Sequence, residues 1–386
     1  MRIALAIMSM ELGGGAEHDI VNLSTGLRKA GHDPIVVTSG GRLCADLQAE
    51  GVTIAICPLW ARTPLKLLRN ADRIAGIIED HDIEVFNPQG VYPAISGRIA
   101  TRKLRRKGRI VPNIVTIHML QRLKWWYYKM GSWGINWSAD HVIVESRCEM
   151  ERLRKGGMTR PTTILHNCFP PKKYAGDPRS PREIRLDMGW PEGKVVFIMP
   201  ARMTDEKGHN VLLKAISRPD VRELPVLFYL AGDGELLEAH KRAAGDLHLD
   251  DSVIFGGFRR DLPSLYQAAD VFLLCSRRES LPLSIREGMG ASLPVLSTNV
   301  GGIAEAVEDG ASGILVQPDD PDALAGAIVL MASDADMRKQ MGRRGQEINR
   351  QKFDYDNWIA KTAELMGGIR REMLAGRTRA SRKRHK

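Results

Sequence analysis

Short runs of apolar and β-branched residues alternate along the chain with longer segments whose apolar positions recur every three or four residues. In segment 16–31, for example, Ile20, Leu23 and Leu27 fall on one face of a helix. The short runs predict strands at 2–8, 34–38, 53–57, 83–86, 113–118, 141–145, 162–166, 195–200, 226–231, 253–256, 271–275, 294–297 and 313–316. Continuously apolar strands that alternate with helices are typical of parallel sheets covered on both sides. We therefore predict an α/β protein with doubly wound parallel sheets.

The alternation stops at residues 167–183, a stretch rich in proline and charge, and then restarts. This linker predicts two domains, at 1–172 and 173–355. A last helical segment near 355–374 has no strand after it, and we expect residues 356–386 to cross back to the first domain. Such sheets bind ligands at the carboxyl ends of their strands, which predicts a cleft between the two domains.

The composition, with 43% hydrophobic and 26% charged residues in 386, is that of a soluble globular protein. No apolar run is long enough to span a bilayer, and the start of the chain suits a buried strand better than a secretory signal. The five cysteines lack metal-ligand spacing, which favours reduced thiols in a cytosolic protein. They are Cys44, Cys57, Cys148, Cys168 and Cys275.

The net charge of +10 is concentrated at residues 101–109 and in the tail, 370–386. Nucleic acid, an anionic membrane surface or a phosphorylated substrate would each explain these clusters, and so would solvated helix faces with a free tail.

Two groups of candidate residues follow strands in the first half of the chain. Gly14 and Gly15 lie between the first strand and the first helix, where backbone amides favour anions, although a tight turn without a ligand explains them equally well. His118 ends a strand, so it is placed to bind a sugar hydroxyl, to transfer a proton, or to serve the structure alone.

The second half offers a stronger pattern. Arg202 and Lys207 follow a buried strand and precede a helix, and two cations beside helix amides suit a diphosphate; an ordinary exposed loop is the alternative. Glu279 precedes the helix that Pro282 opens, and Glu287 lies about five residues inside it. The two glutamates suit the sugar and ribose of an extended ligand, a glycosidase pair, or a helix cap plus a surface acid. The acidic run 318–324 suits helix capping, so we expect no metal ion.

Taken in order, these motifs resemble those of the retaining GT-B glycosyltransferases called group 1 or family 4. The carriers are residues 14–17, the strand ending at His118, 164–167, Arg202 with 206–208, 230–234, 255–258, Glu279 with Glu287, and 293–307. The resemblance implies two Rossmann-like domains, with the acceptor on the first and a nucleotide-sugar donor on the second. The sequence departs from the family pattern at Ser280, Leu281 and Pro282, where glycine, phenylalanine and glycine are usual, and at Cys168.

The resemblance also assigns roles to single residues. Arg202, Lys207, Glu279 and His118 would be catalytic, with Arg202 and Lys207 gripping the diphosphate, Glu279 positioning the sugar and His118 lying near it. Glu287 would hold the ribose. The donor would contact Gly14, Gly15, Arg202, Lys207, Gly232, Phe258, Ser280, Leu281, Pro282, Leu283 and Glu287.

The expected activity is transfer of a hexose with retention, by front-side displacement and without a metal, in cell-surface polysaccharide or glycolipid biosynthesis. Trp125, Trp126, Tyr127 and Tyr128 adjoin basic residues, which predicts an anionic bilayer interface and a lipid-linked acceptor, although core aromatics would give the same pattern. The enzyme would lie in the cytoplasm, on the inner face of its membrane. A nucleotide-sugar epimerase or hydrolase of similar fold, or a basic nucleic-acid-binding protein, remains an alternative.

Overall fold

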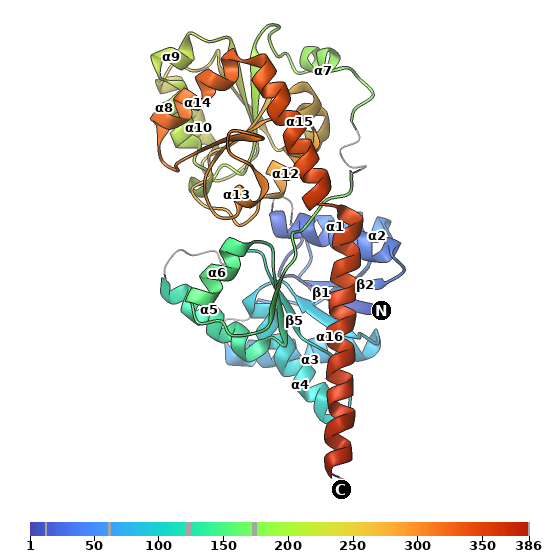
Figure 1. Ribbon diagram of the computed structural model, residues 1–386. Coiled ribbons are helices and arrows are strands. Elements are labelled where there is room, and N and C mark those ends of the chain that lie inside the picture. Colours follow the sequence, from blue (N-terminus) through green and yellow to red (C-terminus); the bar gives the residue numbers. More distant parts are fainter. Residues whose placement is uncertain (12–13, 61–62, 120–124, 172–175, 385–386) are drawn as a thin grey trace. The chain divides into compact units, whose positions relative to one another are not determined.

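This computed structural model describes residues 1–11, 14–60, 63–119, 125–171 and 176–384, without the side chains of Trp125 and of 377–384. The contacts divide the chain into two compact units (Figure 1). Unit 1 comprises Met1–Cys168 and Tyr355–Lys386, and unit 2 comprises Phe169–Asp354.

Unit 1 is built on parallel strands with helices on both sides. Its strands are β1 (Arg2–Ala6), β2 (Asp33–Thr38), β3 (Thr53–Ile56), β4 (Val85–Pro88), β5 (Ile114–Ile117), β6 (His141–Val144) and β7 (Thr162–Ile164). Its helices are α1 (Gly15–Lys29), α2 (Leu43–Ala49), α3 (Pro64–Asp80), α4 (Val91–Arg106), α5 (Trp125–Ser138), α6 (Arg147–Lys155) and α16 (Tyr355–Arg384). The strands pair in the orders β3-β2-β1-β4 and β5-β6-β7, and two isolated parallel bridges link the β4 region to the β5 region.

Unit 2 contains one parallel sheet in the order β10-β9-β8-β11-β12-β13. Its strands are β8 (Val195–Pro200), β9 (Val226–Ala231), β10 (Val253–Gly257), β11 (Val271–Leu274), β12 (Val295–Thr298) and β13 (Gly313–Val316). Its helices are α7 (Pro181–Asp187), η2 (Asp205–Lys207), α8 (His209–Ile216), α9 (Pro219–Arg222), α10 (Leu237–Asp246), α11 (Leu262–Ala268), α12 (Leu283–Gly290), α13 (Ile303–Ala306), α14 (Pro321–Ser333) and α15 (Ala335–Lys352). The order reverses between β8 and β11, which marks the switch point where such sheets bind ligands.

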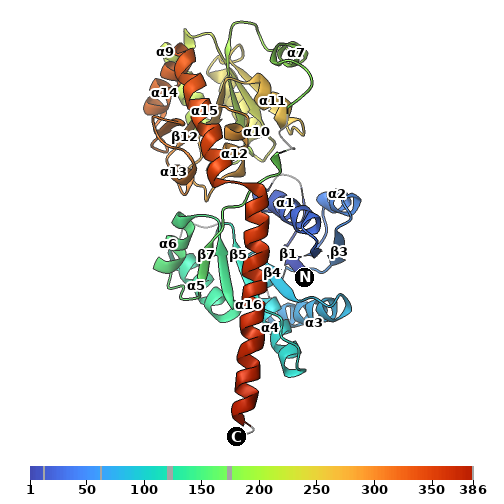
Figure 2. The ribbon, with the colours of Figure 1, turned by 45° about the vertical axis from the view of Figure 1, so that its right-hand side comes forward.

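The last helix, α16, belongs to unit 1 and packs against α1 (Figures 1 and 2). The Tyr355 hydroxyl donates to the carbonyl of Asn22 at 2.7 Å. Gly26 permits the close approach, because a Cβ there would lie 2.4 Å from Cδ1 of Ile359. Trp358 and Ile359 are buried. The helix that lacks a strand of its own is therefore held by apolar packing on the first helix of the chain.

Each of the thirteen predicted strand ranges overlaps an observed strand, and the prediction of an α/β fold with doubly wound parallel sheets is confirmed. The range 83–86 is the least accurate, since β4 begins at Val85. The amide of Ile83 donates to the carbonyl of Ile78 at 3.0 Å, and this bond closes the end of α3. Ile83 therefore belongs to the helix terminus and not to the strand.

The predicted linker also requires a correction. Helix α7 begins at Pro181, inside the stretch 167–183, and Ser180 forms a reciprocal capping box with Glu183. Residues 172–175, in the middle of the same stretch, lie outside the described residues.

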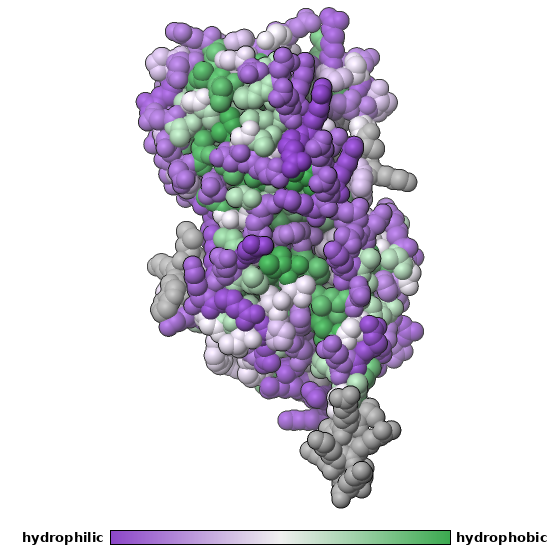
Figure 3. Space-filling view, viewed as in Figure 1, coloured by the Kyte–Doolittle hydropathy of each residue, from purple (hydrophilic) through white to green (hydrophobic). Residues whose placement is uncertain are grey.

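Hydrophilic residues predominate on the face seen in Figure 3, with hydrophobic residues gathered in separate patches. The apolar strands are buried: β9, for example, is buried along its whole length. No helix within the described ranges combines the length and the apolar character needed to cross a membrane.

Candidate active site

The cations predicted in unit 2 follow β8 and lie at the switch point of its sheet. Arg202 comes directly after the strand, and Lys207 ends the short helix η2. Arg202 is exposed, and its guanidinium forms no hydrogen bond or ion pair within the described part of the chain. An unpaired cation beside the start of α8 is available to an anion.

Lys207 and Glu279 form an ion pair. The Nζ of Lys207 donates to Oε1 of Glu279 at 2.6 Å, and the Ser276 hydroxyl donates to the same oxygen at 2.7 Å. The side chains are only 19% and 8% exposed. Glu279 therefore fixes the ammonium group of Lys207, a contact that the sequence did not reveal because the two residues lie on different strand exits.

Tight backbone packing holds the Lys207 loop in place. Gly208 has a φ of 70°, and a Cβ there would lie 2.1 Å from the carbonyl oxygen of Cys275. Only glycine suits both the left-handed conformation and this approach. Arg277 adds further links to this loop and to α8, since its amide donates to the carbonyl of Glu206 at 2.8 Å and its guanidinium contacts Oδ1 of Asp205 at 3.0 Å and Asn210 at 3.0 Å.

Of the four residues after Glu279 that were predicted to contact the donor, two are buried. Ser280 is 7% exposed and Leu281 is 3% exposed, so their side chains pack inside the unit. The carbonyl of Ser280 accepts from the amide of Gly302 at 2.5 Å. Pro282 is the N-cap of α12 and does not belong to its first turn, which corrects the sequence-based placement; Leu283 begins the helix.

Glu287 is the fifth residue of α12, as predicted, and it contacts Tyr266. The Tyr266 hydroxyl donates to Oε2 of Glu287 at 3.2 Å. Burial, followed by the charge of Glu287, raises the pKa of Tyr266 well above its ordinary value, so the phenol remains a donor. Tyr266 orients the carboxylate that was predicted to hold a ribose.

Two further predicted residues follow β9 and β10, the two strands that come after β8 toward one edge of the sheet. Phe258, after β10, is 43% exposed, as a residue that meets a ligand would need to be. Gly232 follows β9, and a Cβ there would lie 2.0 Å from the carbonyl oxygen of Ala201. Gly232 is thus required for close packing against the residue before Arg202.

In unit 1, Gly14 and Gly15 lie at the start of α1. Gly14 is the N-cap with φ −101° and ψ 143°, a conformation that other residues adopt readily, and no atom of the described residues lies within 4 Å of a Cβ added at Gly15. The backbone conformation does not require glycine at Gly14.

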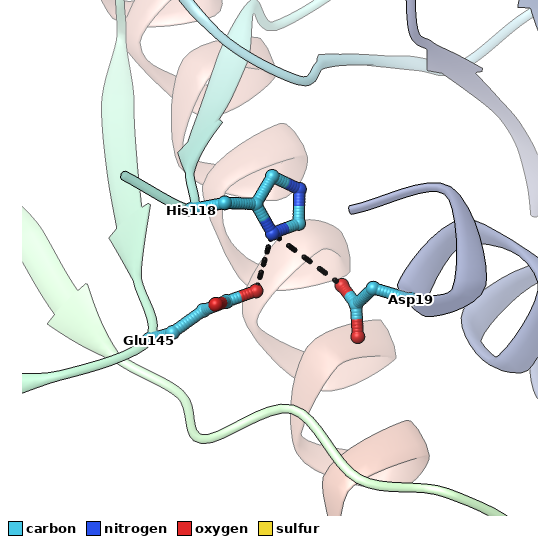
Figure 4. A group of neighbouring side chains, drawn as sticks. All are labelled: Asp19, His118 and Glu145. Atoms are coloured by element: carbon cyan, nitrogen blue, oxygen red, sulfur yellow. Dashed lines mark hydrogen bonds and ion pairs between the residues drawn. The ribbon is translucent and has the colours of Figure 1, made fainter. Parts of the chain in front are cut away.

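His118 follows β5 and lies between two carboxylates (Figure 4). Its Nδ1 contacts Oε1 of Glu145, at the end of β6, and lies 3.9 Å from Oδ2 of Asp19 on α1. Its Nε2 lies 2.8 Å from Oε1 of Gln89. Burial lowers the pKa of His118, but the charges of Glu145, Asp19 and Glu17 and the bond to Glu145 together raise it to about 9. His118 is therefore a cation at neutral pH.

The same three side chains are the described group that could hold a metal ion. The ligand atoms of Asp19, His118 and Glu145 lie within 4.8 Å of one another. A protonated histidine between two carboxylates accounts for this spacing without an ion, because each contact is an ion pair. The sequence signal for Glu145 was a lone acid directly after a buried strand, and Asp19 gave none beyond its place on a helix.

Comparisons with known proteins agree with these observations. The model of the family "Glycosyltransferase Family 4" matches residues 13–173, and that of "Glycosyl transferases group 1" matches residues 181–348. The N-acetyl-alpha-D-glucosaminyl L-malate synthase of Bacillus anthracis is 21% identical over 397 residues, covering 98% of this chain and 100% of that protein. A GDP-mannose-dependent alpha-(1-6)-phosphatidylinositol monomannoside mannosyltransferase of Mycolicibacterium smegmatis is 29% identical over 324 residues, covering 78% and 80%.

Among solved structures, HepE from Anabaena in complex with UDP-glucose superposes with a TM-score of 0.83. It is 22% identical and covers 95% of this chain and 100% of its own. The two family models together span both units, and the structural match extends over nearly the whole chain. The chain therefore belongs to the group 1 glycosyltransferases of the GT-B fold.

Proposed function

We propose that this glycosyltransferase moves a sugar from a nucleoside diphosphate donor, without a metal ion and with retention of anomeric configuration. The observation that carries the proposal is the partly buried Lys207–Glu279 pair at the switch point of unit 2, with Lys207 at the same strand exit as the exposed Arg202. Two cations and one carboxylate leave a net positive charge where a diphosphate would bind. The named dependence of the Mycolicibacterium relative on GDP-mannose and the UDP-glucose bound to HepE support this donor class.

The residues divide the work of the reaction. Arg202 and Lys207 stabilise the negative charge that develops on the departing phosphate oxygen. For Lys207 this requires no reorganisation of the protein, because its ammonium group is already fixed by Glu279. The bond between the anomeric carbon and that oxygen breaks while the acceptor oxygen bonds to the same face, and the acceptor proton passes to the departing phosphate. Glu279 is committed to Lys207 and Ser276, which favours this front-side displacement over a covalent intermediate on Glu279.

We further propose that the acceptor is a lipid-linked saccharide at the inner face of the cytoplasmic membrane, in polysaccharide or glycolipid biosynthesis. Of the aromatics predicted for this surface, Tyr128 is instead buried in the core and Tyr127 packs against it, as the alternative of core aromatics expects. On α5, Trp126, Met130 and Trp133 are 48%, 62% and 71% exposed and follow each other at helical spacing. Lys129 lies beside them, and Arg102 lies over the ring of Trp137 at 4.8 Å. Exposed aromatics mixed with cations suit an anionic bilayer interface. The structure does not describe the other predicted members of this surface: Arg122, Lys124, the side chain of Trp125, and the side chains of the basic tail beyond residue 376.

The donor is tested by thermal shift with UDP-, GDP- and ADP-sugars, followed by product analysis with the stabilising donor. We expect one nucleotide class to raise the melting temperature, and NMR of the product to show the anomeric configuration of the donor. Inversion would contradict retention. Sugar release at full rate without an acceptor would favour the alternative, a hydrolase or epimerase.

The membrane interface is tested by sedimentation with vesicles that contain anionic phosphatidylglycerol. We expect the wild type to co-sediment and the double variant Trp126→Ser/Trp133→Ser to lose most of this binding. Leu186→Ser is the matched control, because Leu186 is an equally exposed apolar residue (70%) of unit 2. Binding that depends on Leu186 but not on the two tryptophans, or retention of random-sequence DNA in place of vesicles, would refute the proposed surface.

A further inference from the structure

A chain of buried amides leads to His118 across the ends of β4 and β5. The Nδ2 of Asn87 donates to the carbonyl of Ile114 at 2.6 Å and to the hydroxyl of Thr116 at 2.9 Å. A main-chain carbonyl can only accept, so the NH2 group of Asn87 must face it. The Oδ1 of Asn87 therefore faces the other way, toward Gln89.

The orientation of Gln89 follows from that of Asn87. The Nε2 of Gln89 lies 2.6 Å from Oδ1 of Asn87 and 3.3 Å from its carbonyl oxygen. A reversed Gln89 would place its own oxygen against two others, in a setting where Asn87 is 0% and Gln89 is 6% exposed. The Oε1 of Gln89 is thereby turned to His118, and it can only accept from Nε2.

Both ring nitrogens of His118 must therefore carry hydrogen. Nε2 faces the oxygen of Gln89, and Nδ1 faces the carboxylate of Glu145. Within the described residues, the charged groups that act on the ring are Glu145 after β6 and Asp19 and Glu17 on α1, all of them acidic. With Glu145 ionised, a neutral imidazole would leave one ring nitrogen without hydrogen facing an acceptor oxygen inside the unit.

We infer that Gln89 and Glu145 are positioning residues that keep His118 doubly protonated, so that it serves the proposed sugar transfer as a fixed cation and not as a base. This role rests on the proposed function, whereas the protonation state itself does not. A substrate oxygen that reaches Nε2 would replace Oε1 of Gln89 and accept a hydrogen bond. The site then favours a substrate oxygen that accepts a hydrogen bond from Nε2, and the positive charge of His118 stabilises that oxygen.

The protonation state is tested by NMR of the 15N-labelled protein between pH 5 and pH 10. We expect the His118 ring to show two N–H groups at pH 7.5 and to titrate near its pKa of about 9. The spectrum of His118→Gln assigns the signal. His141 serves as an internal control, because burial lowers its pKa and it should be neutral at pH 7.5. A neutral His118 at pH 7.5 in the wild type would overturn the inference without any variant.

Glu145→Gln tests the positioning role. We expect the pKa of His118 to fall from about 9 toward about 6.5 in this variant. Glu151→Gln is the matched control, because Glu151 is an exposed acid on α6, and it should leave the titration unchanged. An unchanged titration in Glu145→Gln would contradict the role of Glu145.

The catalytic consequence is read from the dependence of kcat on pH. The alkaline limb should move to lower pH by the same amount as the pKa of His118, up to about 2.5 pH units, in Glu145→Gln, while Glu151→Gln follows the wild type. Coincident profiles, with the NMR shift present, would show that the charge of His118 is not used in the reaction. If no nucleotide sugar is turned over by the wild type, the proposed function fails while the NMR result still decides the protonation.

Discussion

Replacing Lys207 by alanine is the most direct test of the leaving-group site. The change removes an ammonium group that the structure holds 2.6 Å from Glu279. A hydrogen bond to a charged group contributes about 1.5–3 kcal/mol. If Lys207 makes such a bond to the departing phosphate, turnover should fall by about 10- to 150-fold.

The same change affects stability, because it leaves a buried carboxylate. Glu279 is buried and, among the described residues, would keep only the Ser276 hydroxyl as a side-chain partner at Oε1. Removing one member of a buried pair costs about 3–5 kcal/mol, and since Lys207 is 19% exposed we expect the lower end, about 3 kcal/mol. The double variant Lys207→Met/Glu279→Gln removes both charges, so its free energy of unfolding should return toward that of the wild type.

The two effects are separated by measuring steady-state turnover and urea unfolding for the wild type, Lys207→Ala and the double variant. We expect the double variant to be stable and still slow, which would assign the loss to chemistry and not to folding. Near-normal turnover in folded Lys207→Ala would refute the leaving-group role. Recovery of activity together with stability in the double variant would show that the pair serves only the fold.

Three other results are expected. Gly208→Ala should lower the free energy of unfolding by about 2 kcal/mol or more, because its Cβ would lie 2.1 Å from the carbonyl oxygen of Cys275. Gly193→Ala is the control: its φ is 83°, no atom of the described residues lies near its Cβ, and it should cost only about 1 kcal/mol. The charged form of His118 should stabilise the protein fully below its unfolded pKa of about 6.5, and this contribution of roughly 3 kcal/mol should disappear as the pH rises through about 9. Urea titrations of the wild type and His118→Gln would measure it, and parallel pH profiles would contradict it. A chelator should leave turnover unchanged, and a strict requirement for a divalent ion would exclude the metal-free reaction.

The fold follows from the sequence because its signals are local. Apolar strands such as β9 and the capping residues of helices such as α7 act within a few positions, so periodicity alone locates them. The start of β4 was misplaced because Ile83 is apolar like a strand residue, yet its amide closes the preceding helix. Whether Ile83 ends the helix or begins the strand depends on backbone geometry, which the hydrophobic pattern does not report.

The candidate site was predicted less completely, because its contacts join distant residues. Lys207 and Glu279 were each singled out from their strand exits, but their direct bond depends on the adjacency of β8 and β11. Asp19, Glu145 and Gln89 come from three separate elements and meet only around His118. A single sequence gives no information on such pairings.

The charge balance of unit 2 explains why Arg202 and Lys207 would not be interchangeable. Glu279 already neutralises Lys207, so binding a diphosphate there gains little net charge from Lys207 alone. The bond to Glu279 nevertheless holds the ammonium group of Lys207 in place. A group that is already in place can stabilise negative charge that develops during the reaction without the protein having to reorganise. Arg202 is exposed and unpaired within the described residues, so under the proposed function it would supply the unbalanced charge that draws an anion to the site. Donor affinity would then depend mainly on Arg202, and the rate of leaving-group departure mainly on Lys207.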